Sequence, residues 1–245
     1  MPTGAFFEAY RELEQRMKAL ASADGDVFLP NPEPEAPVHY VLVCMEPSLG
    51  RWAHDPNAAT SRVESGFRNF LPSDEVALLH FCVRRYLCRP GERYHLTDFS
   101  KGAMLVERAG PDRVERYRRW FSLLMEEISL VARPDARIIA VGQAVAAQLR
   151  RQGFSREFIS VLHYSGQAAP ARQKGTAGRE DAFAAFANSV SHDDVLAVAR
   201  DVLATSHAPA VIADKTLAKL GRFQLTTSRR QLMFNYKIAF ERLRV

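Results

Sequence analysis

Short apolar runs alternate with stretches of helical periodicity along most of this chain. Four apolar runs predict buried strands, at 39–44, 93–97, 136–141 and 158–163. Apolar residues at the spacing of an amphipathic helix predict helices at 4–21, 58–70, 73–87, 111–131, 143–151, 179–188 and 192–204, and a helical tail over 208–245. Strands that alternate with helices indicate an α/β fold, a three-layer αβα arrangement around a central, mainly parallel, four-stranded sheet.

Polar side chains suited to chemistry follow three of the four predicted strands. They are Glu46, Asp98 and His163, and ligands of such sheets bind beyond the carboxyl ends of the strands. Taken singly, each has a plainer structural explanation: an acid at a helix start, a helix cap or a buried, hydrogen-bonded histidine. Taken together, one carboxylate can hold a water, one can bind a base edge, and the histidine can stabilise a leaving anion. Cleavage of a glycosidic bond needs such a set.

Composition indicates a globular protein of the cytoplasm. The chain has 245 residues, is 47% hydrophobic and 25% charged, and has no apolar run near the ~20 residues that a membrane helix needs. Its N-terminus lacks the apolar core of a signal peptide. The three cysteines, Cys44, Cys82 and Cys88, form no CxxC pair. We therefore expect reduced core thiols and neither a disulfide framework nor a metal site. A monomer is the expected state.

The positive charge of the chain is unevenly distributed. The net charge is +5, yet residues 215–245 alone hold eight Lys and Arg against one Glu. The segment 165–179, expected to be a loop, adds Arg172, Lys174 and Arg179 without an acid. A charge run is usually only a solvated face. Two such segments in one chain predict a surface that faces phosphates, and hence DNA as the partner.

The segments after the strands resemble the motifs of the uracil-DNA glycosylase superfamily, over roughly residues 38–190. The family's first motif, with forms such as GQDPYH, GMNPG and GEAPG, is matched by CMEPS at 44–48, with the shared proline at Pro47. Its HPSP motif is matched by HYSG at 163–166, which keeps the histidine and the serine. Its middle Thr-Asn motif is matched by Thr97-Asp98, and the Gly142-Gln143 turn that opens a helix is also similar. The resemblance implies a DNA glycosylase without a cofactor. It places the glycosylase-like domain, with its N-terminal helix, at 1–190, and leaves 191–245 as a basic helical extension packed on it.

The resemblance also implies roles for single residues. Glu46 falls where the family positions the attacking water, His163 would donate to O2 of the departing base, and Asp98 would bind the base edge. A flipped base also needs an aromatic ring to stack on, and Phe67 and Phe70 are the candidates, against core packing as the plainer explanation. Residues expected to contact DNA are Ser165, Gln167, Lys101, Arg172, Lys174, Arg229 and Arg230. Lys101 is also a candidate nucleophile that would give lyase activity.

Two departures from the family concern the substrate. Uracil-specific members read the base with an asparagine where this chain has Asp98. An ionised carboxylate only accepts hydrogen bonds, which suits the N4 amino group of cytosine and clashes with O4 of uracil. The family's tyrosine beside C5 is replaced by Ser48, which leaves room for a substituent. Both positions favour a C5-modified cytosine, either hydroxymethylcytosine or its glucosylated form as in some phage DNA, and an antiviral role.

Three other interpretations stay open. A repair glycosylase for uracil or mismatched thymine keeps the family and changes the base. A catalytically silent DNA-binding member is favoured by glutamate in place of the usual Asp or Asn at Glu46. A nucleotide-binding α/β protein is disfavoured because the chain has neither GxxxxGK nor GxGxxG. With three cysteines, one of them inside the first motif, we expect no iron–sulfur cluster.

Overall fold

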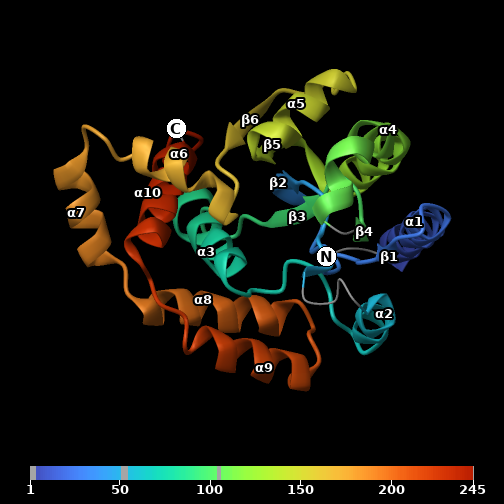
Figure 1. Cartoon of the computed structure of the whole chain (residues 1–245), viewed down its shortest axis with the longest axis horizontal. Helices are drawn as coiled ribbons and strands as arrows, with labels where there is room; N and C mark the ends of the chain where they lie inside the picture. The colour runs from blue at the N-terminus through green and yellow to red at the C-terminus, as the bar shows by residue number, and fades with distance from the viewer. Residues whose placement is uncertain (1–3, 51–54, 104–105, 245) are drawn as a thin grey trace. The chain divides into compact units, whose positions relative to one another are not determined.

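The computed structural model describes residues 4–50, 55–103 and 106–244, and side chains within these ranges apart from 106–112. Two units, each with its own dense internal contacts, divide the chain (Figure 1). Unit 1 comprises Met1–Asn69 and Glu92–Ser160, and unit 2 comprises Phe70–Gly91 and Val161–Val245. Both units are discontinuous in sequence, and unit 2 runs across residue 190. The expected domain boundary at that residue is therefore not the one at which the contacts divide the chain.

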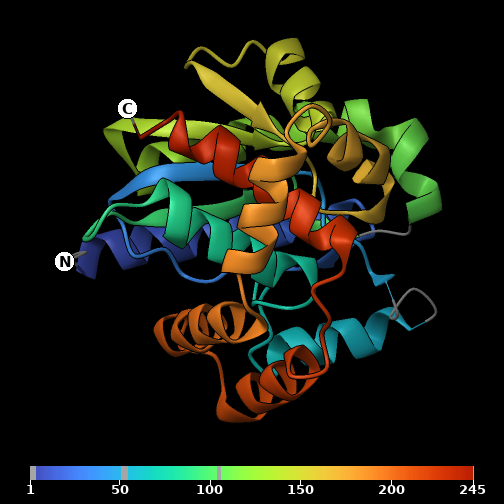
Figure 2. The same cartoon turned by 90° about the vertical axis from the view of Figure 1, so that its left-hand side faces the viewer.

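A four-stranded sheet in the order β3-β2-β5-β6 forms the centre of unit 1 (Figure 2). The central strand β2 (Val38–Cys44) runs parallel to both of its neighbours, β3 (Tyr94–Asp98) and β5 (Ala132–Val141). The edge strand β6 (Phe158–Val161) ends where the chain passes into unit 2. This parallel sheet confirms the α/β class and is compatible with an αβα layering.

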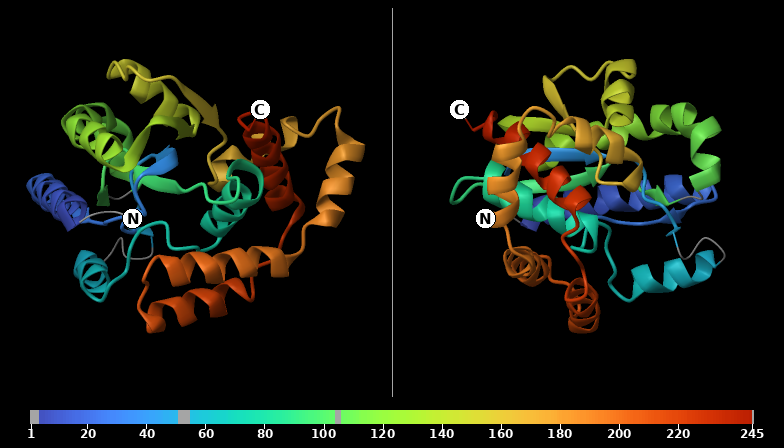
Figure 3. Two further views of the ribbon diagram at one scale, coloured as in Figure 1. Left: turned by 180° about the vertical axis from the view of Figure 1, so that it is seen from behind. Right: turned by 60° about the vertical axis from the view of Figure 1, so that its left-hand side comes forward.

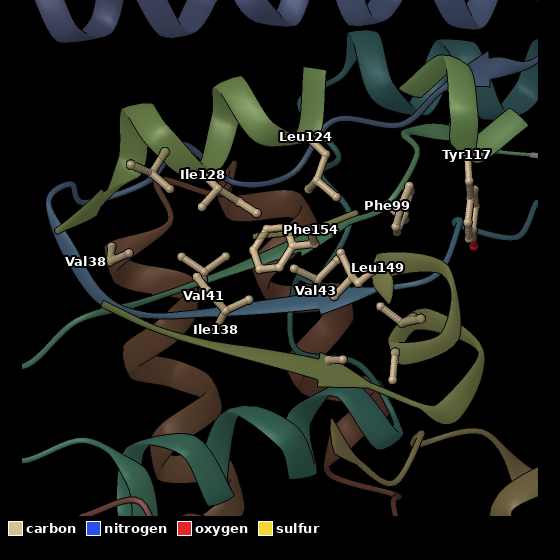
Figure 4. Packing of buried hydrophobic residues seen from close by; sticks show 14 of the residues in the cluster. Val38, Val41, Val43, Phe99, Tyr117, Leu124, Ile128, Ile138, Leu149 and Phe154 are labelled. Atoms are coloured by element: carbon tan, nitrogen blue, oxygen red, sulfur yellow. The ribbon is translucent and has the colours of Figure 1, made fainter. Parts of the chain in front are cut away.

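Three helices of unit 1 contribute to the core on one face of this sheet. They are α1 (Gly4–Ala23), α4 (Val106–Val131) and α5 (Gln143–Arg151). Val41, Val43 and Ile138 of the strands pack against Leu124 and Ile128 of α4 (Figure 4). The remaining elements of unit 1 are α2 (Pro56–Glu64) and a small antiparallel pair, β1 (Val27–Phe28) with β4 (Gly102–Ala103).

Unit 2 is helical. Its first helix, α3 (Glu75–Cys82), continues as a π-helical turn, η2 (Val83–Leu87). After Val161 come η3 (Gly166–Ala168), α6 (Ala169–Lys174), α7 (Glu180–Ser189), α8 (His192–Thr205), α9 (Ala210–Leu220) and α10 (Thr227–Glu241). Helix α10 contacts α3, η2, α6 and α7, and α8 lies beside α9 (Figure 3). Ser191 and Asp194 form a capping box that fixes the start of α8.

Most predicted elements are confirmed, and the differences have local causes. Helix α2 ends at Glu64 rather than at residue 70, because Gly66 adopts a φ of 93° that a right-handed helix cannot continue. Helix α4 begins at Val106, before the expected start at Pro111. The prediction of a loop over 165–179 was wrong, since this segment contains η3 and α6. The strands β1 and β4, of two residues each, are too short to show an alternating pattern.

The three cysteines are buried in the core, as expected, and none is joined in a disulfide bond. No helix within the described part of the chain has the length and apolar character needed to span a membrane.

Acid is expected to destabilise unit 2 through His80. Burial lowers the pKa of this histidine to about 4, and its Nε2 lies 2.7 Å from the carbonyl oxygen of Phe70. The unfolded chain, with an ordinary pKa of 6.5, takes up the proton first. Stability that is complete above pH 6.5 is therefore lost as the pH falls toward 4, by up to about 3 kcal/mol. Urea unfolding at several pH values measures this loss. His80→Gln, which can still donate to Phe70, should flatten the dependence, and an unchanged pH slope in that variant would refute the assignment.

Candidate functional site

The loops that follow β2 and β3 are tied together at the carboxyl end of the sheet. Cys44 and Asp98 are paired in the register of the two strands. The backbone N–H of Phe99 donates to the carbonyl oxygens of Cys44 and Met45, at 2.9 Å each. Glu46, two residues after β2, and Asp98, the last residue of β3, therefore lie at the same edge of the sheet, which is the arrangement that the sequence predicts.

Glu46 is held by two side chains that lie one turn apart on α4. Arg113 donates to its Oε1 from Nη2 at 2.6 Å and to its Oε2 from Nε at 3.3 Å, and the hydroxyl of Tyr117 donates to Oε2. The ring of Tyr117 is fully buried and stacks on Phe99, with centroids 4.2 Å apart and planes at 12°. Only 6% of the Glu46 side chain is exposed. The carboxylate is therefore fixed in position and almost sealed from water.

This clamp leaves Glu46 with little spare hydrogen-bonding capacity. A carboxylate has about four lone-pair positions, and Arg113 and Tyr117 supply three donors. Burial and the neighbouring charge of Glu46 raise the pKa of Tyr117 well above its usual range, so the phenol keeps its proton. Burial lowers the pKa of Arg113, but the hydrogen bond and charge of Glu46 outweigh it and the net shift is upward. Room remains on Glu46 for about one further donor, such as a water.

Asp98 lies in a different environment from Glu46. It is 2% exposed and accepts a 2.6 Å hydrogen bond at Oδ2 from Nδ2 of Asn69. Burial raises the pKa of Asp98 well above its ordinary value, although the charge of Lys101 and the hydrogen bond from Asn69 act in the opposite direction. The charges of Glu46 and Glu127 add to the rise. These surroundings favour the protonated form of the Asp98 carboxyl, which can both donate and accept hydrogen bonds. The interpretation from the sequence assumed the ionised form, which only accepts.

Lys101 does not contact solvent, and its assignment as a DNA-binding residue is wrong. Its ammonium is 2% exposed and donates to Glu127 at 2.7 Å, to Thr97 at 2.7 Å and to the carbonyl oxygen of Asp98 at 3.2 Å. All three of its N–H donors are thereby used. The physical reason is the buried carboxylate of Glu127, which needs a positive partner. The same bonds leave no lone pair on Lys101 for a nucleophilic step.

Glu127 is the centre of this buried network. His95 lies 2.9 Å from its Oε1, opposite the oxygen that Lys101 and Thr97 contact. Burial alone would raise the pKa of Glu127, but the charge of Lys101 and the hydrogen bond and charge of His95 lower it to about 2. Asn31 donates to Thr97 at 3.2 Å and extends the network. The network joins β3 to α4 from inside the core, so its role is to support the strand end that carries Asp98.

The residues expected to contact the base beside Glu46 lie in three different settings. Ser48 is exposed, and its Oγ accepts from the backbone of Gly50 at 3.0 Å. Phe67 is half-buried and packs on the apolar cluster that contains Leu29. Phe70 is only 3% exposed and belongs to unit 2, so the core-packing explanation holds for it and the stacking assignment is wrong.

His163 belongs to unit 2, where its neighbours define the tautomer of its neutral ring. Its Nδ1 accepts from the backbone N–H of Ser165 at 3.0 Å, and its ring stacks on Tyr164 with centroids 4.4 Å apart. A backbone N–H only donates, so the neutral ring must carry its proton on Nε2. His163 is thereby set up as a hydrogen-bond donor through Nε2, as its expected role requires.

Three of the arginines expected to hold phosphates have structural roles instead. Arg172 is 3% exposed and donates to backbone carbonyls in the HYSG segment, including that of Ser165 at 2.7 Å. Arg229 binds Glu75 through two nitrogens at 3.0 and 3.1 Å, and Arg230 donates to three backbone carbonyls. Because their guanidinium groups are committed to unit 2 itself, their assignment as DNA-binding residues is corrected. Arg172 instead orders the backbone next to His163.

Other expected contacts are accessible. Gln167 and Lys174 are exposed and Ser165 is half-buried. Unit 2 holds fifteen Lys and Arg against nine Asp and Glu, a net charge of +6, whereas unit 1 has a net charge of −1. The positive charge of the protein therefore resides in unit 2, and side chains with no committed role, such as Lys174, Arg179 and Arg222, carry it at the surface.

The sequence did not reveal Arg113, Tyr117 or Asn69 as site residues. The spacing of Arg113 and Tyr117 does indicate a shared helix face, but nothing along the chain indicates that this face meets Glu46. Asn69 lies in a turn without any motif around it. Within the described ranges, no group of three or more His, Cys, Asp or Glu is arranged to hold a metal ion.

No protein-family model matches the chain, and no curated protein matches it significantly.

Proposed function

We propose that this protein is a DNA glycosylase with a fold of the uracil-DNA glycosylase type, which flips a base out of DNA and excises it by hydrolysis. The observation that supports this best is the contrast between two carboxyl groups at adjacent strand ends. Glu46 is paired with a cation, and Asp98 is buried in surroundings that favour its protonated form. Paired acids whose environments differ in this way are typical of enzymes that use one as an anion and the other as a hydrogen-bond donor.

The proposed reaction uses water and no cofactor. The C1′–N1 bond breaks and its electron pair leaves with the base, while the negative charge of Glu46 stabilises the cationic sugar. The remaining lone-pair position of Glu46 orients a water, which attacks C1′. The proton that the water loses balances the charge of the base anion, so the products are an abasic site and the neutral base. The family resemblance also implies a donor to O2 of the departing base, and within unit 2 His163 carries the Nε2–H that such a role needs. The Nζ of Lys101 is held by three hydrogen bonds within the fold, which supports a monofunctional glycosylase without lyase activity.

The proposed substrate is a cytosine modified at C5, hydroxymethylcytosine or its glucosylated form, which gives the protein a role in defence against phage DNA. A protonated Asp98 can donate to N3 of cytosine and accept from its N4 amino group. Ser48, small and exposed, supports space for a C5 substituent. The basic surface of unit 2 supports DNA as the carrier of that base.

Uracil, or thymine mispaired with guanine, is the second candidate substrate. The burial of Asp98 is the observation that favours it, because a protonated carboxyl can also donate to O4 and accept from N3–H. The sequence disfavours uracil because an ionised Asp98 would face O4, and both groups are acceptors. This clash applies only to the ionised form of Asp98.

A set of oligonucleotides separates these substrates. Each carries one uracil, one thymine opposite guanine, one cytosine, one hydroxymethylcytosine or one glucosylated hydroxymethylcytosine, as single and double strands, and is treated with alkali after incubation in EDTA. We expect breakage at a modified cytosine and none at cytosine. Breakage only at uracil or at mispaired thymine would indicate a repair glycosylase instead. No breakage on any strand would contradict the enzyme proposal and favour a silent DNA-binding protein.

A further inference from the structure

Asn69 is the half-exposed partner of the buried Asp98. Its backbone N–H donates to the carbonyl oxygen of Pro30 at 2.7 Å, which anchors the turn. Its Nδ2 donates to Oδ2 of Asp98 at 2.6 Å. Asp98 is only 2% exposed, whereas Asn69 keeps part of its surface accessible. Of the two side chains, Asn69 is the one that an incoming molecule meets more easily.

The amide of Asn69 has hydrogen-bonding capacity left over. An asparagine side chain has two N–H donors and an oxygen with two lone pairs. One N–H is used on Asp98, and across the described residues neither the second N–H nor Oδ1 has a hydrogen-bond partner. A free acceptor and a free donor on one planar group form the pattern with which an amide reads a base edge in two bonds.

The bond to Asp98 also gives this amide a direction. Because Nδ2 is bound to Asp98, the nitrogen of Asn69 is kept on that side and Oδ1 on the other. Cytosine needs the amide oxygen opposite N4 and the nitrogen opposite N3. Uracil needs the oxygen opposite N3 and the nitrogen opposite O4. For a base held in one orientation, an amide fixed in one direction distinguishes the two, whereas an amide free to flip accepts both.

We propose that Asn69 reads the edge of the excised base and that Asp98 is the positioning residue that fixes the direction of its amide. The inference rests on the proposed glycosylase function and changes which residue determines specificity. The charged and titratable groups that act on Asp98 are Lys101, Glu46 and Glu127, with the Tyr117 phenol also coupled to it. Oδ2 accepts from Nδ2 both in the ionised Asp98 and in a protonated Asp98 whose proton is on Oδ1, so the direction of the amide persists across pH.

The test measures kcat/KM for one modified cytosine and for uracil in the same duplex. Asn69→Ala is expected to lower kcat/KM for the preferred base roughly 5- to 150-fold and to narrow the ratio between the two bases. Asp98→Asn, whose amide can either accept from or donate to Asn69, is expected to keep excision and narrow the ratio. If Asp98 had a purely structural role, Asp98→Asn would lower kcat/KM for the modified cytosine and for uracil by the same factor, and the ratio between the two bases would be unchanged.

Asn57→Ala, at an exposed position of α2, is the matched control and should behave as wild type. If Asn69→Ala does not fold, Asn69→Gln, which displaces the amide by one methylene, takes its place with the same expectation. Unchanged rates and ratio in the Asn69 variant, with active wild-type protein, would overturn this inference alone. A wild-type protein that excises neither base would overturn the glycosylase proposal, and this inference with it.

Discussion

Replacing Glu46 by glutamine is expected to lower the rate of base excision by about 10²- to 10⁴-fold. The substitution keeps the shape of the side chain and removes its negative charge, which is the charge proposed to stabilise the cationic sugar. The clamp should survive in part, because the amide oxygen of glutamine can still accept from Arg113 or Tyr117. Folding and DNA affinity should therefore stay close to those of the wild-type protein.

Single-turnover excision measures this effect apart from product release, and a binding titration measures DNA affinity beside it. Glu64→Gln removes one negative charge at an exposed position of α2 and is the matched control. Tyr117→Phe, which deletes one of the three hydrogen bonds to Glu46, should give a smaller loss than Glu46→Gln. Full activity in Glu46→Gln would contradict a catalytic role for this carboxylate.

Replacing Lys101 by methionine is expected to destabilise the protein by about 3–5 kcal/mol. The substitution removes the ammonium that neutralises the buried carboxylate of Glu127 and leaves His95 and Thr97 as its hydrogen-bond partners. In the wild-type protein the pKa of Glu127 is lowered to about 2 from an ordinary 4.5. The stabilisation is therefore present above pH 4.5 and is lost as the pH falls toward 2.

Urea unfolding at pH 7 and at pH 4 tests this expectation. In Lys101→Met the unpaired carboxylate takes up a proton more readily, so the difference from wild type should be larger at pH 7 than at pH 4. Combining Lys101→Met with Glu127→Leu removes both charges and should restore much of the lost free energy of unfolding. Lys18→Met, at an exposed position of α1, is the matched control. Wild-type stability of Lys101→Met at pH 7 would show that the ion pair does not form.

The regular part of the fold was predictable because its pattern is strong over many residues. Helix α5 runs from Gln143 to Arg151 as its periodicity indicates, and β2 is the apolar run that precedes Glu46. The helix α6 was missed because its short, basic sequence carries no apolar face. Residues 70–91 join residues 161–245 in unit 2 because α3 packs against α8 and α10. A local sequence pattern does not indicate such long-range packing.

The site was predictable only where chain topology determines it. Parallel strands bring their carboxyl ends to one edge, and this placed Glu46 beside Asp98. Side-chain partners come from elements distant in sequence, so Arg113 on Glu46 and Asn69 on Asp98 emerge only in three dimensions. Charge was the least reliable guide. Arg172 lies in a predicted phosphate-facing segment and Lys101 was a predicted DNA contact, yet both are buried and bonded within the fold.

Direct detection of a released base tests the central claim most closely. Duplex DNA with a single hydroxymethylcytosine or glucosylated hydroxymethylcytosine is incubated with the protein, and the small-molecule fraction is analysed by mass spectrometry. We expect the free modified base together with an intact strand that carries one abasic site, and neither product with Glu46→Ala. No free base from these duplexes or from their uracil counterpart, while the protein binds the DNA, would contradict the assignment of this chain as a glycosylase.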